Sequence, residues 1–115
     1  MKRLMTTFLL IWGILTISSN ATAMTVVEYQ ESKDNKKTWP VTLIYLNGVG
    51  VGASLAASLL LQQGGSSVFC QPTEITLKKE DYIRLIDAFI AKNDVKDAPV
   101  ESILFFALVT AFPCK

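Results

Sequence analysis

Two cysteines and ten carboxylates are the side chains of this 115-residue chain that most readily carry catalysis or bind metal, and the chain has no histidine. It therefore lacks the commonest general base and the commonest metal ligand. The carboxylates are scattered, and the adjacent pair Glu80 and Asp81 would point to different faces of a helix. The sequence predicts a binding protein rather than an enzyme, without metal ion or cofactor. A hydrolase that uses two carboxylates is the enzymatic alternative.

The first 23 residues have the three parts of a secretory signal peptide. A basic start, Met1-Lys2-Arg3, precedes an uncharged run over residues 4–17 and the pattern Ala21-Thr22-Ala23, which is typical of a cleavage site. The run is shorter than the ~20 apolar residues that span a membrane. We therefore expect cleavage near Ala23 rather than an uncleaved N-terminal anchor. The mature chain, residues 24–115, is expected to be one periplasmic domain.

Export decides the expected state of the cysteines. The mature chain holds two of them, Cys70 and Cys114, and an exported protein meets an oxidising compartment. We therefore expect a Cys70–Cys114 disulfide, which removes the thiolate as nucleophile or ligand. Lys2 and Arg3 leave with the signal, so nine of the eleven basic residues remain against ten acidic ones, a net charge of −1. The chain has no basic stripe, so nucleic acid is not expected as a partner. A small-molecule substrate is not expected either.

Helical periodicity dominates the mature chain, and no segment of useful length alternates with the period of a strand. Residues 26–31 predict only a weak, frayed helix, because the stretch that follows them is polar and charged. Residues 77–92 and 99–113 carry apolar side chains at helical spacing, with Thr76 as the expected N-cap of the first. The predicted fold is all-α, a small helical bundle of three main helices plus a weak N-terminal helix, with one disulfide.

The longest helix is expected over residues 41–61, which carry no charge. Its length suits a transmembrane helix, but polar residues and glycines dilute its apolarity. We therefore favour a largely buried central helix of a soluble bundle. Gly48, Gly52 and Ala56 have the small-xxx-small spacing of closely packed helices. They either pack against the last helix of the same chain, which we favour, or form the seam of a homodimer.

Short motifs follow one another in a fixed order between residues 40 and 114. They are Tyr45-Leu46-Asn47-Gly48-Val49 with Gly52, Phe69-Cys70-Gln71-Pro72, Thr76-Leu77, Pro99-Val100 and Phe112-Pro113-Cys114. This ordered set resembles the Tai/Rap immunity proteins of type VI secretion systems. The resemblance implies a small, helical, periplasmic protein, dimeric in some members, that binds and blocks a peptidoglycan amidase effector. Many members carry a further cysteine pair near the mature N-terminus, and its absence here implies a looser N-terminal part.

An inhibitor of an amidase must occlude the cleft of the enzyme, and loops on a rigid core can do so. We expect two loops, residues 62–67 and 93–97, with Trp39 as an anchor at the margin. The candidate partner-binding residues are Trp39, Gln62, Gln63, Gly64, Gly65, Ser66, Ser67, Asn93, Asp94, Lys96 and Asp97. A plain solvated connector is the alternative for each loop, and a cover over one end of the core is the alternative for Trp39.

Two other functions stay open. A helical exported protein of this length with one disulfide is also similar to the HdeA-like periplasmic acid chaperones, which bind many unfolded clients at low pH. The other is a membrane-inserted helical protein with residues 41–61 in lipid. Breadth of binding separates immunity protein from chaperone, and solubility of the mature chain without detergent tests the membrane alternative.

Overall fold

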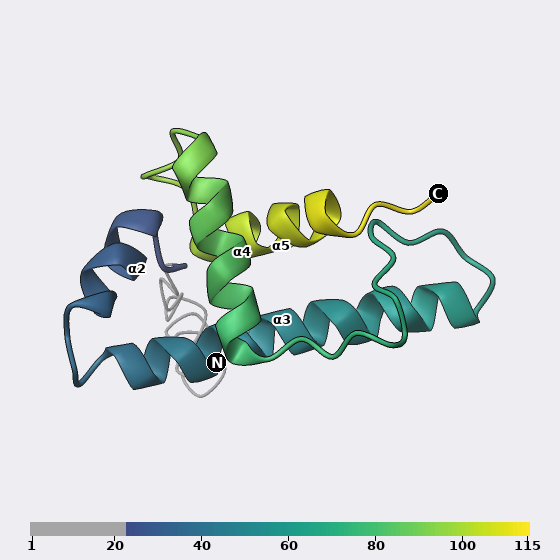
Figure 1. Cartoon of the computed structure of the whole chain (residues 1–115), viewed down its shortest axis with the longest axis horizontal. Coiled ribbons are helices and arrows are strands. Elements are labelled where there is room, and N and C mark those ends of the chain that lie inside the picture. The colour runs from purple at the N-terminus through teal and green to yellow at the C-terminus, as the bar shows by residue number, and fades with distance from the viewer. Residues whose placement is uncertain (1–22) are drawn as a thin grey trace, which may run out of the picture.

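The computed structural model describes residues 23–115. Within them it has four helices: α2 (Val26–Lys33), α3 (Trp39–Gln62), α4 (Lys79–Lys92) and α5 (Val100–Ala111). α4 crosses α3 and α5 at a steep angle, and α2 lies near the N-terminal end of α3 (Figure 1). The predicted all-α fold with one disulfide is confirmed. Residues 1–22 of the predicted signal peptide lie outside the described residues.

The core lies where α3, α4 and α5 meet. Five buried side chains of α5 recur at the spacing of one helix face: Val100, Ile103, Leu104, Ala107 and Leu108. The sequence predicts this face, although Ala111, which continues the spacing, is exposed. From α3 and α4 the core takes Leu46, Tyr82 and Ile86, each at most 2% exposed.

The expectation of a frayed first helix is wrong. Thr25 caps α2 in a reciprocal pair, in which its Oγ1 accepts the Glu28 N–H at 3.2 Å and the Glu28 carboxylate accepts the Thr25 N–H at 2.7 Å. This arrangement stabilises a helix start. Val26 and Tyr29 are 1% and 0% exposed, so two apolar anchors in a polar segment hold the helix onto the core.

The chain around the start of α2 is fixed by the segment that leads into α5. The backbone N–H of Val26 donates to Ala98 O at 3.0 Å, and that of Val27 donates to Lys96 O at 3.2 Å. The Val100 N–H donates to Met24 O at 2.7 Å. The looser N-terminal part implied by the missing cysteine pair is therefore not found, because backbone hydrogen bonds tie this part down.

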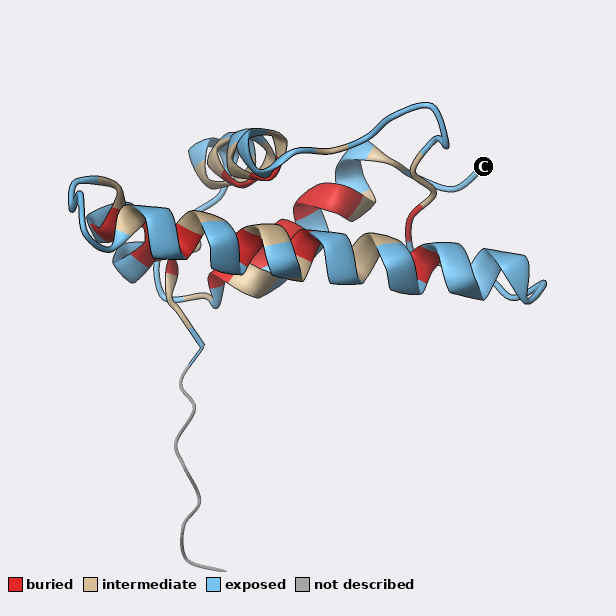
Figure 2. Cartoon of the chain, turned by 90° about the horizontal axis from the view of Figure 1, so that it is seen from below, coloured by how far each residue is buried: buried red, intermediate tan, exposed pale blue. Residues whose placement is uncertain are grey.

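The predicted burial of the longest helix is also wrong. Of the most apolar 18-residue stretch of α3, only 17% is buried, and most of its surface is exposed along its length (Figure 2). α4 and α5 have 14 and 12 residues, and α4 crosses α3, so they cover one side of a 24-residue helix. α3 is long and apolar enough to cross a membrane by length and composition.

α4 starts later than predicted, at Lys79 rather than at residue 77. Its first turn is held by Asp81 and not by Thr76: the Asp81 carboxylate accepts the Lys78 N–H at 2.8 Å. This hydrogen bond lowers the pKa of Asp81, and the nearby Arg84 guanidinium adds to the effect. An acidic side chain in the first turn also suits the helix dipole.

Candidate partner-binding surfaces

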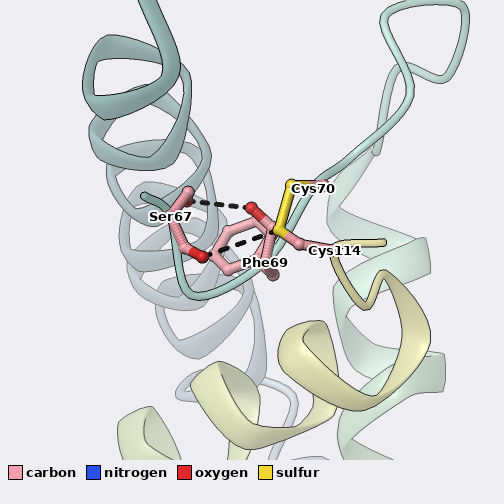
Figure 3. Close-up of a disulfide and its surroundings, with 4 residues drawn as sticks. All are labelled: Ser67, Phe69, Cys70 and Cys114. Atoms are coloured by element: carbon pink, nitrogen blue, oxygen red, sulfur yellow. Dashed lines mark hydrogen bonds between the residues drawn. A yellow bond between two sulfur atoms is a disulfide. The ribbon is translucent and has the colours of Figure 1, made fainter. Parts of the chain in front are cut away.

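The predicted disulfide is present and forms a joint between the connector after α3 and the end of α5 (Figure 3). The Cα atoms of Cys70 and Cys114 lie 4.9 Å apart. The Cys70 N–H donates to Phe112 O at 2.8 Å, and beside the bridge the Ser67 hydroxyl donates to Phe69 O at 2.9 Å. The Phe69 ring is 1% exposed. The residue directly before Cys70 in the sequence is therefore fixed in the core.

The loop over residues 62–67 connects α3 to this joint. At its start, the Gly65 N–H donates a backbone hydrogen bond to Leu60 O at 2.9 Å, which ties the loop to the end of α3. Gly64 has a φ of 74°, in the left-handed region that favours glycine. Residues 62–66 are exposed and Ser67 is half-buried. The loop is thus an exposed turn whose two ends are held by the helix and by the disulfide joint.

The loop over residues 93–97 joins α4 to α5 near the other end of the molecule (Figure 1). Its first residue closes α4, because the Asn93 side-chain amide donates to Phe89 O at 2.8 Å. Asp94, Lys96 and Asp97 are exposed, but the backbone carbonyl of Lys96 binds α2. The structure does not bring the two predicted loops together, so they cannot form one continuous contact patch.

Trp39 lies at the first position of α3 and is half-buried. Its ring centroid lies 6.0 Å from that of Tyr29 at an interplanar angle of 58°. The Lys33 ammonium lies 5.9 Å from the Trp39 ring centroid, within the range of a cation–π contact. This position matches the alternative in which Trp39 covers one end of the core.

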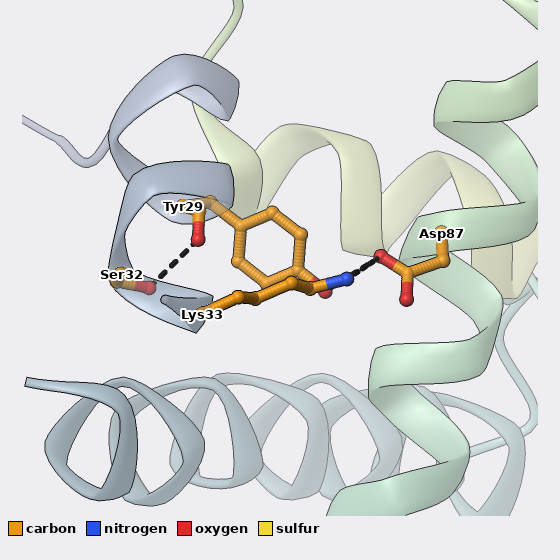
Figure 4. A network of polar contacts seen from close by, with 4 residues as sticks. All are labelled: Tyr29, Ser32, Lys33 and Asp87. Atoms are coloured by element: carbon orange, nitrogen blue, oxygen red, sulfur yellow. Dashed lines mark hydrogen bonds and ion pairs between the residues drawn. The ribbon is translucent and has the colours of Figure 1, made fainter. Parts of the chain in front are cut away.

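A polar cluster that the sequence analysis missed joins α2 to α4 (Figure 4). The Tyr29 hydroxyl donates to Asp87 Oδ1 at 2.9 Å, and the Lys33 Nζ lies 2.5 Å from the same oxygen. Burial raises the pKa of Tyr29, and the hydrogen bond and charge of Asp87 raise it further. The available signal was the spacing of Tyr29 and Lys33, four apart on one helix face. The cluster links two helices, so we assign it a structural role.

An exposed apolar stripe runs along α3. We define the α3 stripe as the residues that recur at helical spacing on its open face: Val41, Ile44, Tyr45, Gly48, Gly52, Leu55 and Leu59. Ile44, Val41 and Leu55 are 72%, 66% and 60% exposed. An exposed apolar stripe is typical of a surface that binds a partner or a membrane.

The predicted packing of the small residues within the chain is wrong. A Cβ added at Gly48 or Gly52 would meet no atom within 4 Å, and Ala56 is exposed. The glycine that allows close packing is Gly50, where a Cβ would lie 2.5 Å from the Tyr82 ring. Gly50 is out of the small-xxx-small register, so the spacing pattern pointed to the wrong face. The homodimer seam stays a prediction.

An open cleft of about 670 Å³ lies between α2 and the first turns of α3. Its lining includes Glu28 and Glu31 from α2 and Tyr45 from α3. The Tyr45 hydroxyl donates to Glu101 Oε1 of α5. This hydrogen bond, with a smaller effect of burial, raises the pKa of Tyr45 to about 12. Within residues 23–115, no three His, Cys, Asp or Glu side chains gather to hold a metal ion.

Comparisons with known proteins give no relative for this chain. No family model, no curated protein and no solved structure matches the chain.

Proposed function

We propose that this chain is an exported immunity protein that binds and occludes a peptidoglycan amidase effector of a type VI secretion system. The observation that carries the proposal is the disulfide joint. Two motifs of the resemblance, Phe69-Cys70-Gln71-Pro72 and Phe112-Pro113-Cys114, lie far apart in the sequence and meet there in one packed unit. In this proposal residues 1–23 direct export, and residues 24–115 act in the periplasm without catalysing a reaction.

The loop over residues 62–67 is the occluding element in this proposal. Its two ends are held by α3 and by the disulfide joint, while its middle is exposed and uncharged. A loop that is ordered before binding loses less conformational entropy in the complex. The loop over residues 93–97 already uses a carbonyl to bind α2, so it is the weaker candidate. We expect a dissociation constant in the nanomolar range, which corresponds to a binding free energy of ~−12 kcal/mol.

The test is protection from a toxin. Each amidase encoded beside this gene is sent to the periplasm with and without this protein, and growth at neutral pH is measured. The Ser66→Arg variant places a long charged side chain in the loop and should weaken binding at least tenfold, about 1.4 kcal/mol. The matched control, Asp94→Arg, changes the other loop and should still protect. Equal protection by both variants would move the interface away from residues 62–67.

One observation favours a second function. The exposed apolar stripe of α3 is the kind of surface with which an acid chaperone of the HdeA-like class could hold unfolded clients. Failure to protect against every neighbouring amidase, together with suppression of aggregation of many clients only near pH 2–3, would support the chaperone. Complete partition of the mature chain into membranes after a carbonate wash would instead support the membrane-inserted alternative for α3.

A further inference from the structure

Glu101, in the first turn of α5, holds a carboxylate that is only partly satisfied. Its Oε1 accepts two hydrogen bonds, one from the Tyr45 hydroxyl and one from the Met24 backbone nitrogen at 3.3 Å. Its Oε2 is buried and has no hydrogen-bond partner among residues 23–115. A buried carboxylate oxygen without a donor is costly and rare in native proteins. The site therefore lacks one donor on the side of Oε2.

The nitrogen next to this carboxylate is held in place by residues that follow it in the chain. Met24 O accepts the Val100 N–H at 2.7 Å, and the next residues are tied through Val26 N–H to Ala98 O at 3.0 Å. The Met24 side chain also packs against the core. None of these contacts uses residues 1–23, so the Met24 nitrogen can keep its position without them.

The surroundings of Met24 favour a positive charge. Met24 lines the cleft between α2 and α3 together with Glu28 and Glu31, and within the part of the chain that the structure describes no lysine or arginine lines it. The Glu28 carboxylate binds the Thr25 N–H and hydroxyl. Among the described residues, the charged or titratable groups near Met24 are Glu101 from α5, Glu28 and Glu31 from α2, and Tyr45 from α3. Lys96 and Asp97 lie in the segment that binds the start of α2, and both are exposed. An unbalanced group of carboxylates attracts a cation.

We propose that cleavage between Ala23 and Met24 completes this site, by creating an α-ammonium group on Met24 that pairs with the Glu101 carboxylate. Water adds across the peptide bond, its oxygen stays on the new Ala23 carboxylate, and the released Met24 amine takes up a proton. A peptide nitrogen offers one N–H, whereas an ammonium offers three. One of them keeps the hydrogen bond to Oε1, and a second can reach Oε2.

In this pairing Glu101 binds the mature N-terminus. Folding is therefore more favourable after cleavage before Met24 than before cleavage. The pairing rests on the export part of the proposed function and is independent of the amidase partner. An α-amino group has an ordinary pKa of about 7.7–8.0, and an opposite charge in contact raises it. The stabilisation is therefore present below pH 8 and is lost as the pH rises through the raised pKa of the folded state.

The test compares two chains that differ by one residue: residues 24–115, released from a fusion cut immediately before Met24, and residues 23–115. In the shorter chain we expect the α-amino pKa, followed by NMR, to lie about one pH unit above its ordinary value. Its folding equilibrium constant at pH 7 should exceed that of the longer chain about tenfold. The excess should shrink between pH 7 and pH 9.5, below the range in which Tyr45 titrates.

The decisive variant is Glu101→Gln, which keeps an acceptor for Tyr45 and Met24 but removes the charge. It should return the α-amino pKa of the 24–115 chain to its ordinary value and abolish the difference from the 23–115 chain. The control Glu31→Gln, which removes a carboxylate from the cleft that Met24 lines, should leave most of the difference. An ordinary α-amino pKa in the unaltered chain would overturn the ion pair. Mass spectrometry of the exported protein that finds another first residue would overturn the processing step, and neither result bears on the immunity assay.

Discussion

Gly50 offers the sharpest test of how α3 packs on α4. A Cβ built at this position would lie 2.5 and 2.6 Å from the Tyr82 Cε1 and Cζ atoms, whereas carbon atoms in good contact lie about 3.5–4.0 Å apart. Tyr82 is 2% exposed, so its ring is packed among other groups. Gly50→Ala must therefore push the two helices apart by about 1 Å or move the ring into its neighbours.

Two opposing effects set the magnitude. Replacing a glycine inside a helix by alanine stabilises it by about 1 kcal/mol, and overpacking a core costs about 1–3 kcal/mol. At Gly48 and Gly52 an added Cβ meets no atom within 4 Å, so only the first effect operates there. Gly48→Ala should thus stabilise the monomer by up to about 1 kcal/mol. The difference between Gly50→Ala and Gly48→Ala cancels the helix propensity and should be about 1–3 kcal/mol.

Urea unfolding of residues 24–115, followed by circular dichroism at several protein concentrations, measures this difference. The double variant Gly50→Ala/Tyr82→Leu should lose less stability than the sum of the single variants, because the smaller side chain relieves the contact. Equal stability of Gly50→Ala and Gly48→Ala would refute the described approach of α3 to α4. A loss at Gly52→Ala that is present at high protein concentration and shrinks on dilution would instead reveal a dimer seam on the α3 stripe.

Three further perturbations have defined outcomes. Cys114→Ala opens the loop closed with Cys70 and should lower the free energy of unfolding by about 4 kcal/mol, seen as a lower urea midpoint without added reductant; an unchanged midpoint would contradict the staple. Because the folded pKa of Tyr45 is raised to about 12, its contribution is present below pH 10 and is lost as the pH rises toward 12; Tyr45→Phe should flatten this part of the stability profile, and so should Glu101→Gln. The pKa of Asp81 is lowered in the folded state, so its contribution to stability is present above its unfolded pKa and is lost as the pH falls through its folded pKa. Asp81→Asn should therefore reduce the loss of stability in acid. An unchanged dependence of stability on acidic pH would rule this contribution out.

The sequence by itself determined the three main helices, the disulfide and the core face of α5. Val100, Ile103, Leu104 and Leu108 recur at the spacing of one helix face, so any fold that buries this helix must bury that side. Cysteine pairing follows from the expected oxidising compartment and from a count of two. These features are local or compositional, and each needs no knowledge of which elements meet.

Only the tertiary structure decided which faces are covered. A polar stretch predicted a frayed α2, yet Tyr29 anchors this helix through a contact with Asp87. The local sequence could not reveal this contact, because Asp87 lies 58 residues away in the sequence. The small residues of α3 pointed to Gly48 and Gly52, but the angle at which α4 crosses α3 selected Gly50 and left the stripe open. Apolar periodicity records that a face can be buried, while the length and crossing of neighbouring helices decide whether it is. The meeting of Met24 with Glu101, 77 residues apart, belongs to the same class of information.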